Sequence, residues 1–193
     1  MVQFATDTHA HRMLKLIVLD RDGVINHDSD HFIKSPEEWR AIPGSLEAIA
    51  RLNQAGYRVV VATNQSGVGR GLFGMTMLTA IHEKMFKALA QAGGRIDAVF
   101  YCPHAADSQC DCRKPKPGML EAIGSRFGVD LIDVPAVGDG LRDLQAAHAV
   151  GARPILVLTG KGEKTLAAGN LPPGTYFLAI RAGAALHVLP LVR

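Results

Sequence analysis

The sequence predicts an α/β fold with a doubly wound parallel sheet that carries helices on both faces. Short runs of apolar, often β-branched residues without polar alternation are typical of strands buried on both faces of a sheet. Segments with apolar residues at helical spacing separate these runs, and this alternation implies parallel strands joined by helical crossovers. Several runs lead directly into polar clusters, where open α/β sheets bind their ligands.

Residues 16–19 are four consecutive aliphatic residues, which predict a strand that runs into charge. Asp20 and Asp22 follow two residues apart, so in extended backbone both carboxylates face one side and Arg21 faces the other. Two such charges about 4–5 Å apart repel by about 3–4 kcal/mol at an effective dielectric of about 20, so they need a cation or a shared proton. Oxygen ligands here suit Mg2+. An ordinary surface turn is the alternative.

Residues 26–39 mix polar and aromatic side chains without a period, which predicts a loop beside the end of the first strand. Asp28 and His31 are its candidate substrate-binding residues. Residues 45–55 then place apolar side chains at helical spacing, which predicts a helix. Its start has Ser45, a helix N-cap type, and its end has Gly56.

Residues 57–63 form a β-branched run of strand length, and hydroxyl and amide groups follow at its carboxyl end. These groups, with free backbone N–H donors, suit a bound phosphate; they belong to Thr63, Asn64, Gln65 and Ser66. A strand-to-helix turn capped by Ser66 is the alternative. Arg70 lies between two glycines and is a candidate for binding a second anionic group of the substrate, or else a solvated loop residue.

Residues 75–92 carry apolar residues at i, i+3 and i+4 spacing, which predicts an amphipathic helix. Met85 belongs to its core-facing side, and we expect His82 on its surface. Two glycines end this helix, and residues 96–101 predict the third strand.

A candidate metal site follows the third strand. One imidazole and three thiolates at C-x-H and C-x-C spacing can close a tetrahedral site around Zn2+ with no open position, which is typical of a structural ion. The ligands are Cys102, His104, Cys110 and Cys112. Free thiols with a chance histidine are the alternative.

The cysteine loop runs directly into two cations, so ordering Cys110 and Cys112 also orders Arg113 and Lys114. Arg113 suits a substrate phosphate as a fork-shaped donor, and Lys114 is the candidate for bridging a nucleophile and a transferred phosphate. A basic turn that favours solubility is the alternative. Pro117 fits the first turn of a helix over residues 118–127.

Residues 134–137 predict a fourth strand, which again ends in acid. Asp139 follows it and is a candidate Mg2+ ligand or, alternatively, a helix N-cap. Gly140 adjoins the same site, and Asp143 lies four residues after Asp139 on one face of a helix over residues 141–150. The chain ends with predicted strands over 155–158 and 176–180 and a helix from about residue 182.

Four of these clusters resemble the motifs of the haloacid dehalogenase superfamily of phosphohydrolases. The Asp-Arg-Asp-Gly segment resembles the first motif, Thr63 the second, Lys114 the third, and the GDxxxD segment at 138–143 the fourth. The C-x-H and C-x-C loop is similar to that of the histidinol-phosphatase-like branch. The resemblance spans residues 20–143 and implies a Rossmann-like fold with a zinc-binding loop and no large cap domain.

The resemblance also implies roles for individual residues. Asp20 would be the nucleophile, Asp22 the general acid and base, and Thr63 and Lys114 would bind the transferred phosphoryl group. Mg2+ would be held by Asp20, Asp139 and the backbone carbonyl of Asp22. The implied activity is that of a phosphoric monoester hydrolase that acts on a sugar bisphosphate as a cytoplasmic monomer.

Two other functions stay open, and two departures from the family pattern bear on the substrate. Histidinol-phosphate phosphatase is the enzymatic alternative, and a non-catalytic zinc-containing binding domain is the alternative of another class. The segment between the zinc ligand pairs, residues 105–109, is short, and Gly140 stands where the family commonly has Lys.

Length and composition agree with this interpretation. The 193 residues, 48% of them hydrophobic, suffice for one core, so we expect a mobile tail over 1–12 and one domain over 13–193. A net charge of +3 without a run of basic residues disfavours nucleic acid as a partner. No apolar stretch reaches 18 residues, and the tail lacks the apolar core of a signal peptide, so we expect a cytoplasmic protein without membrane contact.

Overall fold

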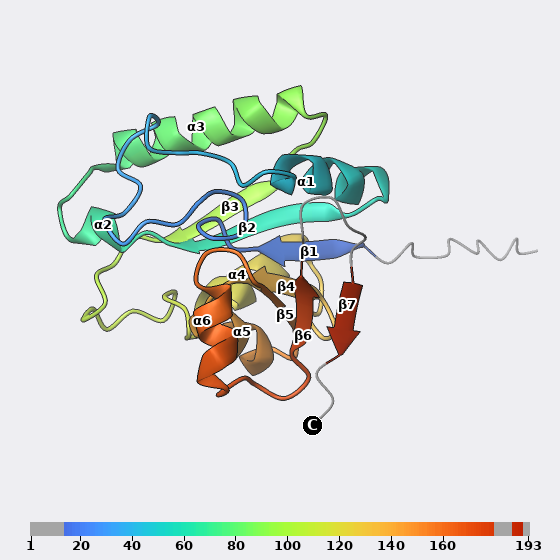
Figure 1. Ribbon diagram of the computed structural model, residues 1–193. Coiled ribbons are helices and arrows are strands. Elements are labelled where there is room, and N and C mark those ends of the chain that lie inside the picture. The colour runs from blue at the N-terminus through green and yellow to red at the C-terminus, as the bar shows by residue number, and fades with distance from the viewer. Residues whose placement is uncertain (1–13, 180–186, 191–193) are drawn as a thin grey trace, which may run out of the picture.

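Seven strands form one sheet in the computed structural model, which describes residues 14–179 and 187–190 (Figure 1). Their order is β3-β2-β1-β4-β5-β6-β7, and all neighbouring strands are parallel except β6 and β7. The strands are β1 (Leu16–Leu19), β2 (Arg58–Asn64), β3 (Ala98–Cys102), β4 (Pro135–Gly138), β5 (Arg153–Val157), β6 (Tyr176–Ala179) and β7 (His187–Pro190). The predicted parallel sheet is therefore confirmed, with one antiparallel strand at its edge.

Helices cover both faces of this sheet. In Figure 1, α1 and α3 lie on one face, and α4 and α5 lie on the other. The helices are α1 (Ser45–Gln54), α2 (Ser66–Gly69), α3 (Met75–Gln91), α4 (Gly118–Phe127), α5 (Leu141–Ala149) and α6 (Gly162–Ala168). Within the described residues, none of the helices combines the length and apolar character needed to cross a membrane.

The first strand lies at the centre of the core. All four side chains of β1 are at most 7% exposed. Successive side chains of a strand point to opposite faces, and here each face is covered. Ile17 belongs to one apolar cluster with Met85 of α3, and Val18 belongs to the other with Ile123 of α4. Each buried aliphatic side chain of this kind stabilises the fold by about 1.5–3 kcal/mol.

The strand order reverses at β1, which lies between β2 and β4. Leu19 pairs with Val61 of β2 and with Val137 of β4. The N–H of Asp20 donates to the Val137 carbonyl oxygen at 2.8 Å, so the pairing continues one residue beyond β1. The residues that follow these three strands therefore meet at one edge of the sheet, the usual ligand site of open α/β folds.

Two long connections contain neither a helix nor a regular strand. Residues 20–44 join β1 to α1, and residues 103–117 join β3 to α4. Neither connection therefore holds an inserted domain. This agrees with the expectation of a fold without a large cap domain.

The C-terminal prediction is wrong. Residues 187–190 form β7, antiparallel to β6, where the sequence predicts a helix from about residue 182. The open edge of β6 offers these residues backbone hydrogen bonds, which local helix preference does not outweigh. Pro190 is tolerated because it lies on an edge strand. The tail predicted over residues 1–12 lies outside the described residues.

Candidate active site

Three carboxylates meet at the carboxyl edge of the sheet. Asp20 follows β1, Asp139 follows β4, and Asp143 lies in the first turn of α5. One oxygen atom of each carboxylate lies within 4.8 Å of those of the other two. Asp139 is only 5% exposed, and the side chains of the other two are 12–13% exposed. We call these three residues the acidic triad.

Burial and repulsion from neighbouring carboxylates disfavour the charged forms of Asp20 and Asp139. Burial raises the pKa of Asp20 from 3.8 to about 8; the Lys114 ammonium opposes this rise, and the neighbouring carboxylates add to it. Burial also raises the pKa of Asp139 to about 6, against a hydrogen bond from the Lys161 N–H. A cation between the carboxylates would favour their charged forms. This all-oxygen donor set fits Mg2+, which Asp20, Asp139 and Asp143 would hold.

The segment that joins β5 to α6 encloses Asp139. The Lys161 N–H donates to Asp139 Oδ2 at 2.7 Å, and Thr165 Oγ1 donates to the Asp139 carbonyl oxygen at 2.8 Å. Gly160 approaches so closely that an added Cβ would lie 2.1 Å from Asp139 Oδ2 and 2.6 Å from the Cα of Gly23. Because no side chain fits there, glycine at position 160 permits the observed place of the carboxylate.

We expect Gly160→Ala to weaken Mg2+ binding by about 10- to 100-fold, a range typical when a group that orients a metal ligand is lost. The added methyl group must displace the Asp139 carboxylate from the other two. Calorimetric titration with Mg2+ measures the change. Gly169→Ala is the matched control, because Gly169 also has a positive φ, of 72°, but has nothing within 4 Å of an added Cβ. Equal Mg2+ affinity in the two variants would contradict the assignment of this site.

Lys114 is buried between two members of the triad, with 4% exposure. Its Nζ donates to Asp20 Oδ1 at 3.1 Å, to Asp143 Oδ1 at 2.5 Å and to the Ala62 carbonyl oxygen at 2.7 Å. Burial alone would lower the pKa of Lys114, but the charges of Asp143 and Asp20 raise it, so the ammonium stays protonated. The Asn64 side chain accepts from the Lys114 N–H at 3.1 Å and donates to its carbonyl oxygen at 3.0 Å, which positions this lysine.

The carboxylate of Asp22 is held by a separate set of donors. Arg21 Nη2 lies 2.9 Å from both of its oxygens, Asn26 Nδ2 donates to Oδ1 at 2.8 Å, and Gln65 Nε2 donates to Oδ2 at 2.9 Å. Burial would raise the pKa of Asp22, but the Arg21 charge and these hydrogen bonds lower it below its ordinary value. Gln65 Nε2 also donates to Thr63 Oγ1 at 2.9 Å, so one amide links the Asp22 carboxylate to the Thr63 hydroxyl.

This arrangement corrects the prediction for residues 20–22. The expectation that Arg21 faces away from both carboxylates is wrong: Arg21 is 0% exposed and its guanidinium contacts Asp22. The physical reason is a turn directly after β1, where the N–H groups of Ile25 and Asn26 both donate to the Arg21 carbonyl oxygen. Strand alternation therefore ends at Asp20.

A pocket of about 290 Å³ opens over the triad. Most of the predicted site residues line it: Asp20, Asp22, Asp28, Thr63, Asn64, Gln65, Ser66, Arg70, Arg113, Lys114, Asp139 and Gly140. His31 does not; it is exposed. A turn closed by the Phe32 N–H and the Ser29 carbonyl oxygen, 3.1 Å apart, reverses the loop, so that Phe32 lines the pocket and His31 does not.

Several residues of this site were not predicted from the sequence. Arg142 and Lys161 line the pocket beside the predicted arginines, and Lys161 Nζ pairs with Asp28 Oδ2 at 3.0 Å. The spacing of Asp143 from Asp139 was a signal for the third triad carboxylate, because four residues later on a helix is the same face. Lys161 had no such signal, since its place depends on how the β5–α6 connection crosses the sheet edge. The lining therefore combines carboxylates, which suit a metal ion, with arginine and lysine side chains, which suit an anionic group of a ligand.

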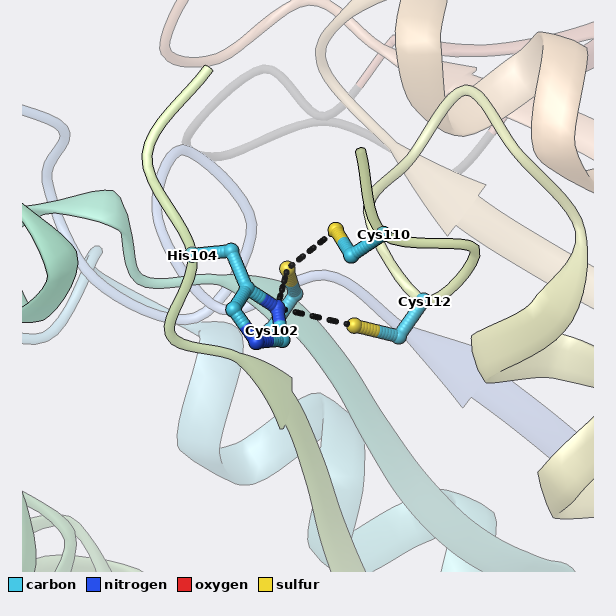
Figure 2. A group of neighbouring side chains, drawn as sticks. All are labelled: Cys102, His104, Cys110 and Cys112. Carbon is cyan, nitrogen blue, oxygen red and sulfur yellow. Dashed lines mark hydrogen bonds between the residues drawn. The ribbon is translucent and has the colours of Figure 1, made fainter. Parts of the chain in front are cut away.

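The predicted zinc ligands lie together, and Figure 2 shows their side chains gathered in one place. Their donor atoms all lie within 4.8 Å of one another. Cys102 Sγ lies 3.7 Å from Cys110 Sγ and 3.5 Å from His104 Nδ1, and Cys112 Sγ lies 3.3 Å from the same nitrogen. Tetrahedral zinc bonds of about 2.3 Å to sulfur and about 2.0–2.1 Å to nitrogen imply edges of about 3.8 Å and about 3.5 Å. The donor set and its dimensions therefore fit Zn2+.

The loop that holds the cysteine–histidine cluster also contacts two cations of the pocket. Cys102 ends β3 and is fully buried, and burial raises the pKa of its thiol to about 12, which an ion would reverse. Arg113 Nη1 donates to the His104 carbonyl oxygen at 3.3 Å, so a cation of the pocket is bonded to the loop itself. Cys112 is two residues from Lys114 in the chain.

A buried lysine lies beside a strand-end aspartate at the point where the parallel sheet reverses its strand order. Phosphatases of the haloacid dehalogenase superfamily are built in this way, and the chain belongs to that superfamily. Two family models match it, one described as HAD-hydrolase-like over residues 111–180 and one as polynucleotide kinase 3 phosphatase over residues 15–139. More specifically, the chain belongs to the family of D-glycero-D-manno-heptose 1,7-bisphosphate 7-phosphatases, which are phosphoric monoester hydrolases, as its relatives show.

Two curated relatives carry the name D-glycero-β-D-manno-heptose-1,7-bisphosphate 7-phosphatase. The one from Bordetella bronchiseptica is 64% identical and the alignment covers 84% of this chain and 90% of the relative. The one from Pseudomonas aeruginosa is 52% identical, with coverage of 90% and 97%. A solved structure of D,D-heptose 1,7-bisphosphate phosphatase from B. bronchiseptica, complexed with magnesium and phosphate, is similar with a TM-score of 0.84, 63% identity, and coverage of 85% and 92%.

Proposed function

We propose that this chain removes the 7-phosphate of D-glycero-β-D-manno-heptose 1,7-bisphosphate through an aspartyl-phosphate intermediate. The observation that supports the chemistry is the contact between Asp20 and the buried Lys114 ammonium, 3.1 Å apart, inside the acidic triad. The names of relatives that are 52–64% identical over most of the chain support the substrate and the β anomer.

Asp20 is the proposed nucleophile. Its carboxylate oxygen attacks phosphorus in line, an Asp20–phosphorus bond forms, and the bond to the sugar oxygen breaks. Lys114 and Thr63, which line the pocket beside Asp20, stabilise the equatorial phosphoryl oxygens as charge develops on them. Mg2+ bound to the triad would neutralise carboxylate and phosphate charge and act as a Lewis acid.

Asp22 is the proposed general acid and base. Its donors hold it ionised in this structure, the state that suits a base taking a proton from the water that hydrolyses the aspartyl-phosphate. In the first step Asp22 must instead carry the proton for the departing sugar oxygen. The negative charge of a bound phosphate raises the pKa of a nearby carboxyl group, which favours that protonation.

The remaining pocket residues are proposed to bind the rest of the substrate. Arg70 and Arg113 are available for the second phosphate, and Arg113 can do so as a fork-shaped donor. Ser66 and Asp28 line the pocket and offer oxygen atoms to the sugar hydroxyls, and Gly140 leaves room where a longer side chain would reach in. The side chains of Asn64 and Gln65 already bond protein groups, so their role is to position Lys114 and Asp22.

Family likeness supports the wider assignment. We propose that the enzyme needs Mg2+ for turnover, holds a structural Zn2+, and acts as a cytoplasmic monomer in the synthesis of ADP-heptose for lipopolysaccharide, or of GDP-heptose. The similar B. bronchiseptica phosphatase was solved as a complex with magnesium and phosphate. The fit of the acidic triad and of the thiolate-imidazole cluster supports the two metals here.

Steady-state release of phosphate tests the substrate. The purified chain with Mg2+ is assayed on both anomers of the heptose bisphosphate and on histidinol phosphate. We expect the β anomer to be preferred over histidinol phosphate by about 10²-fold or more in kcat/KM, since the pocket's cations for a second phosphate would stay unpaired with the smaller substrate. Preference for histidinol phosphate would favour that alternative, and no Mg2+-dependent hydrolysis of any phosphorylated sugar would favour a non-catalytic domain.

A further inference from the structure

A buried histidine contacts the arginine that holds Asp22. His82 lies in the middle of α3, 61 residues from Arg21 in the chain, and its Nε2 lies 3.3 Å from Arg21 Nη1. His82 is 8% exposed and Arg21 is 0% exposed. The expectation of a surface histidine is therefore wrong: helical periodicity placed it beside the core stripe, and the turn after β1 brings Arg21 against it.

The identity of the donor settles the state of this ring nitrogen. A guanidinium has only N–H donors, so Nε2 of His82 must be the unprotonated acceptor. Burial and, to a smaller extent, the Arg21 charge lower the pKa of His82 to about 4, against the opposing charge of Asp22. The ring therefore remains neutral and able to accept at neutral pH.

The guanidinium of Arg21 is held at both of its ends. At one end its Nε and Nη2 bond the Asp22 carboxylate at 2.9–3.1 Å. Nη2 also donates to Gln65 Oε1 at 3.2 Å, and Gln65 donates back to Asp22. At the other end Nη1 meets His82. A planar group fixed at opposite ends has one orientation, and it transmits that orientation to the carboxylate.

We propose that His82 is a positioning residue of the reaction, which fixes the Arg21 fork and thereby aims the Asp22 carboxylate at the leaving-group oxygen. This inference rests on the proposed function, because it assumes that Asp22 transfers the proton. His82 itself does not touch the pocket, and it acts only through Arg21. Its loss leaves Nη1 of a buried cation without this acceptor, so the fork is free to tilt.

A leaving-group comparison separates positioning from simple structural support. The sugar oxygen must be protonated as it departs, whereas p-nitrophenolate leaves as a stable anion and needs no acid. If only the orientation of the Asp22 carboxylate is disturbed, kcat/KM falls for the sugar phosphate and stays the same for p-nitrophenyl phosphate. A general loosening of the fold lowers both alike, because attack by Asp20 is common to the two substrates.

The experiment compares His82→Leu, His82→Gln and Met85→Ala in the full chain with Mg2+. We expect His82→Leu to lower kcat/KM for the heptose bisphosphate by about 10²-fold, the lower range for loss of acid–base catalysis, with little change for p-nitrophenyl phosphate. His82→Gln keeps an acceptor and should restore most of the loss. Met85→Ala is the matched control: Met85 is 0% exposed on the same helix and belongs to an apolar cluster, so its truncation destabilises α3 and leaves the hydrogen-bond partners of Arg21 in place.

Three results would overturn the inference: equal loss on both substrates, no rescue by His82→Gln, or a selective loss in Met85→Ala as well. If His82→Leu does not fold, Arg21→Lys takes its place, since it keeps the charge and loses the fork, and it must show the same selectivity. Failure of the proposed substrate is recognised in the wild type itself, which would then cleave p-nitrophenyl phosphate but not the heptose bisphosphate. The comparison is then made with the alkyl phosphate that the wild type does cleave.

Discussion

Asp20→Asn should lower kcat by at least about 10³-fold, because an amide cannot form the aspartyl-phosphate, and loss of a nucleophile in a serine protease costs on the order of 10⁶. Phosphate release from the heptose bisphosphate measures it. The matched control is Asp97→Asn. Asp97 is a mostly buried carboxylate that bonds the Val59 N–H at 2.9 Å and Arg58 at 3.1 Å and does not line the pocket. We expect that control to keep its kcat and to lose stability. A tenth of wild-type activity in Asp20→Asn would rule out this nucleophile.

The same variant has a second readout in the metal-free protein. The pKa of Asp20 is raised from 3.8 unfolded to about 8 folded, chiefly by burial. Between these values the folded state holds a proton that the unfolded state has released, so stability falls as pH rises through this window. Asparagine does not titrate, so between about pH 5 and about pH 8 the Tm of the variant should fall by less than the Tm of the wild type. A steeper fall in the variant would contradict the raised pKa.

Cys112→Ser should abolish the proposed binding of zinc and also lower the activity. The tetrahedral site needs four donors, and binding of a structural ion contributes directly to folding. With its ligand lost, the loop no longer orders Arg113 and Lys114, so we expect kcat/KM to fall by about 10- to 100-fold. We also expect a lower Tm, by about 2–4 °C for each 1 kcal/mol of lost stability in a chain of this length. Metal content by mass spectrometry, Tm and phosphate release are measured on one preparation.

Asp107→Asn is the control for the zinc site. Asp107 lies in the same loop, is exposed, and does not belong to the cluster of four ligands. This variant should keep one zinc ion per chain and wild-type activity. If Cys112→Ser lost its zinc and kept full activity and Tm, the loop would not support the phosphate site, and its link to Lys114 would be wrong.

The parts of the site that follow strand ends could be predicted from the sequence. Asp20, Thr63 and Asp139 each come directly after an apolar run, and the carboxyl ends of parallel strands meet at one edge. The cysteine–histidine cluster was also predictable, because three thiols and one imidazole in one short segment, at C-x-H and C-x-C spacing, are typical donors of a closed tetrahedral site. In both cases the chemistry depends on local spacing and on one general property of the fold.

The parts that depend on contacts distant in the chain could not be predicted. The strand rule failed at Arg21, since a turn after β1 buries this residue against His82 of α3. His31 failed for a similar reason, because a turn in its loop places Phe32 toward the pocket instead. The C-terminal helix prediction failed because pairing with β6 satisfied the backbone of residues 187–190.

By itself the sequence determined the fold class, the strand-end residues of the site and the four members of the cysteine–histidine cluster. Each of these follows from a hydrophobic pattern or a residue spacing within a short segment of the chain. Only the tertiary structure decided which third carboxylate joins Asp20 and Asp139, and which donors hold Asp22. Both sets of contacts depend on how helices and loops lie across the edge of the sheet. A shift of a few ångströms there changes which side chains are in contact. The positions of these helices and loops are fixed by the packing of the whole chain, so they cannot be predicted from a short segment of the sequence.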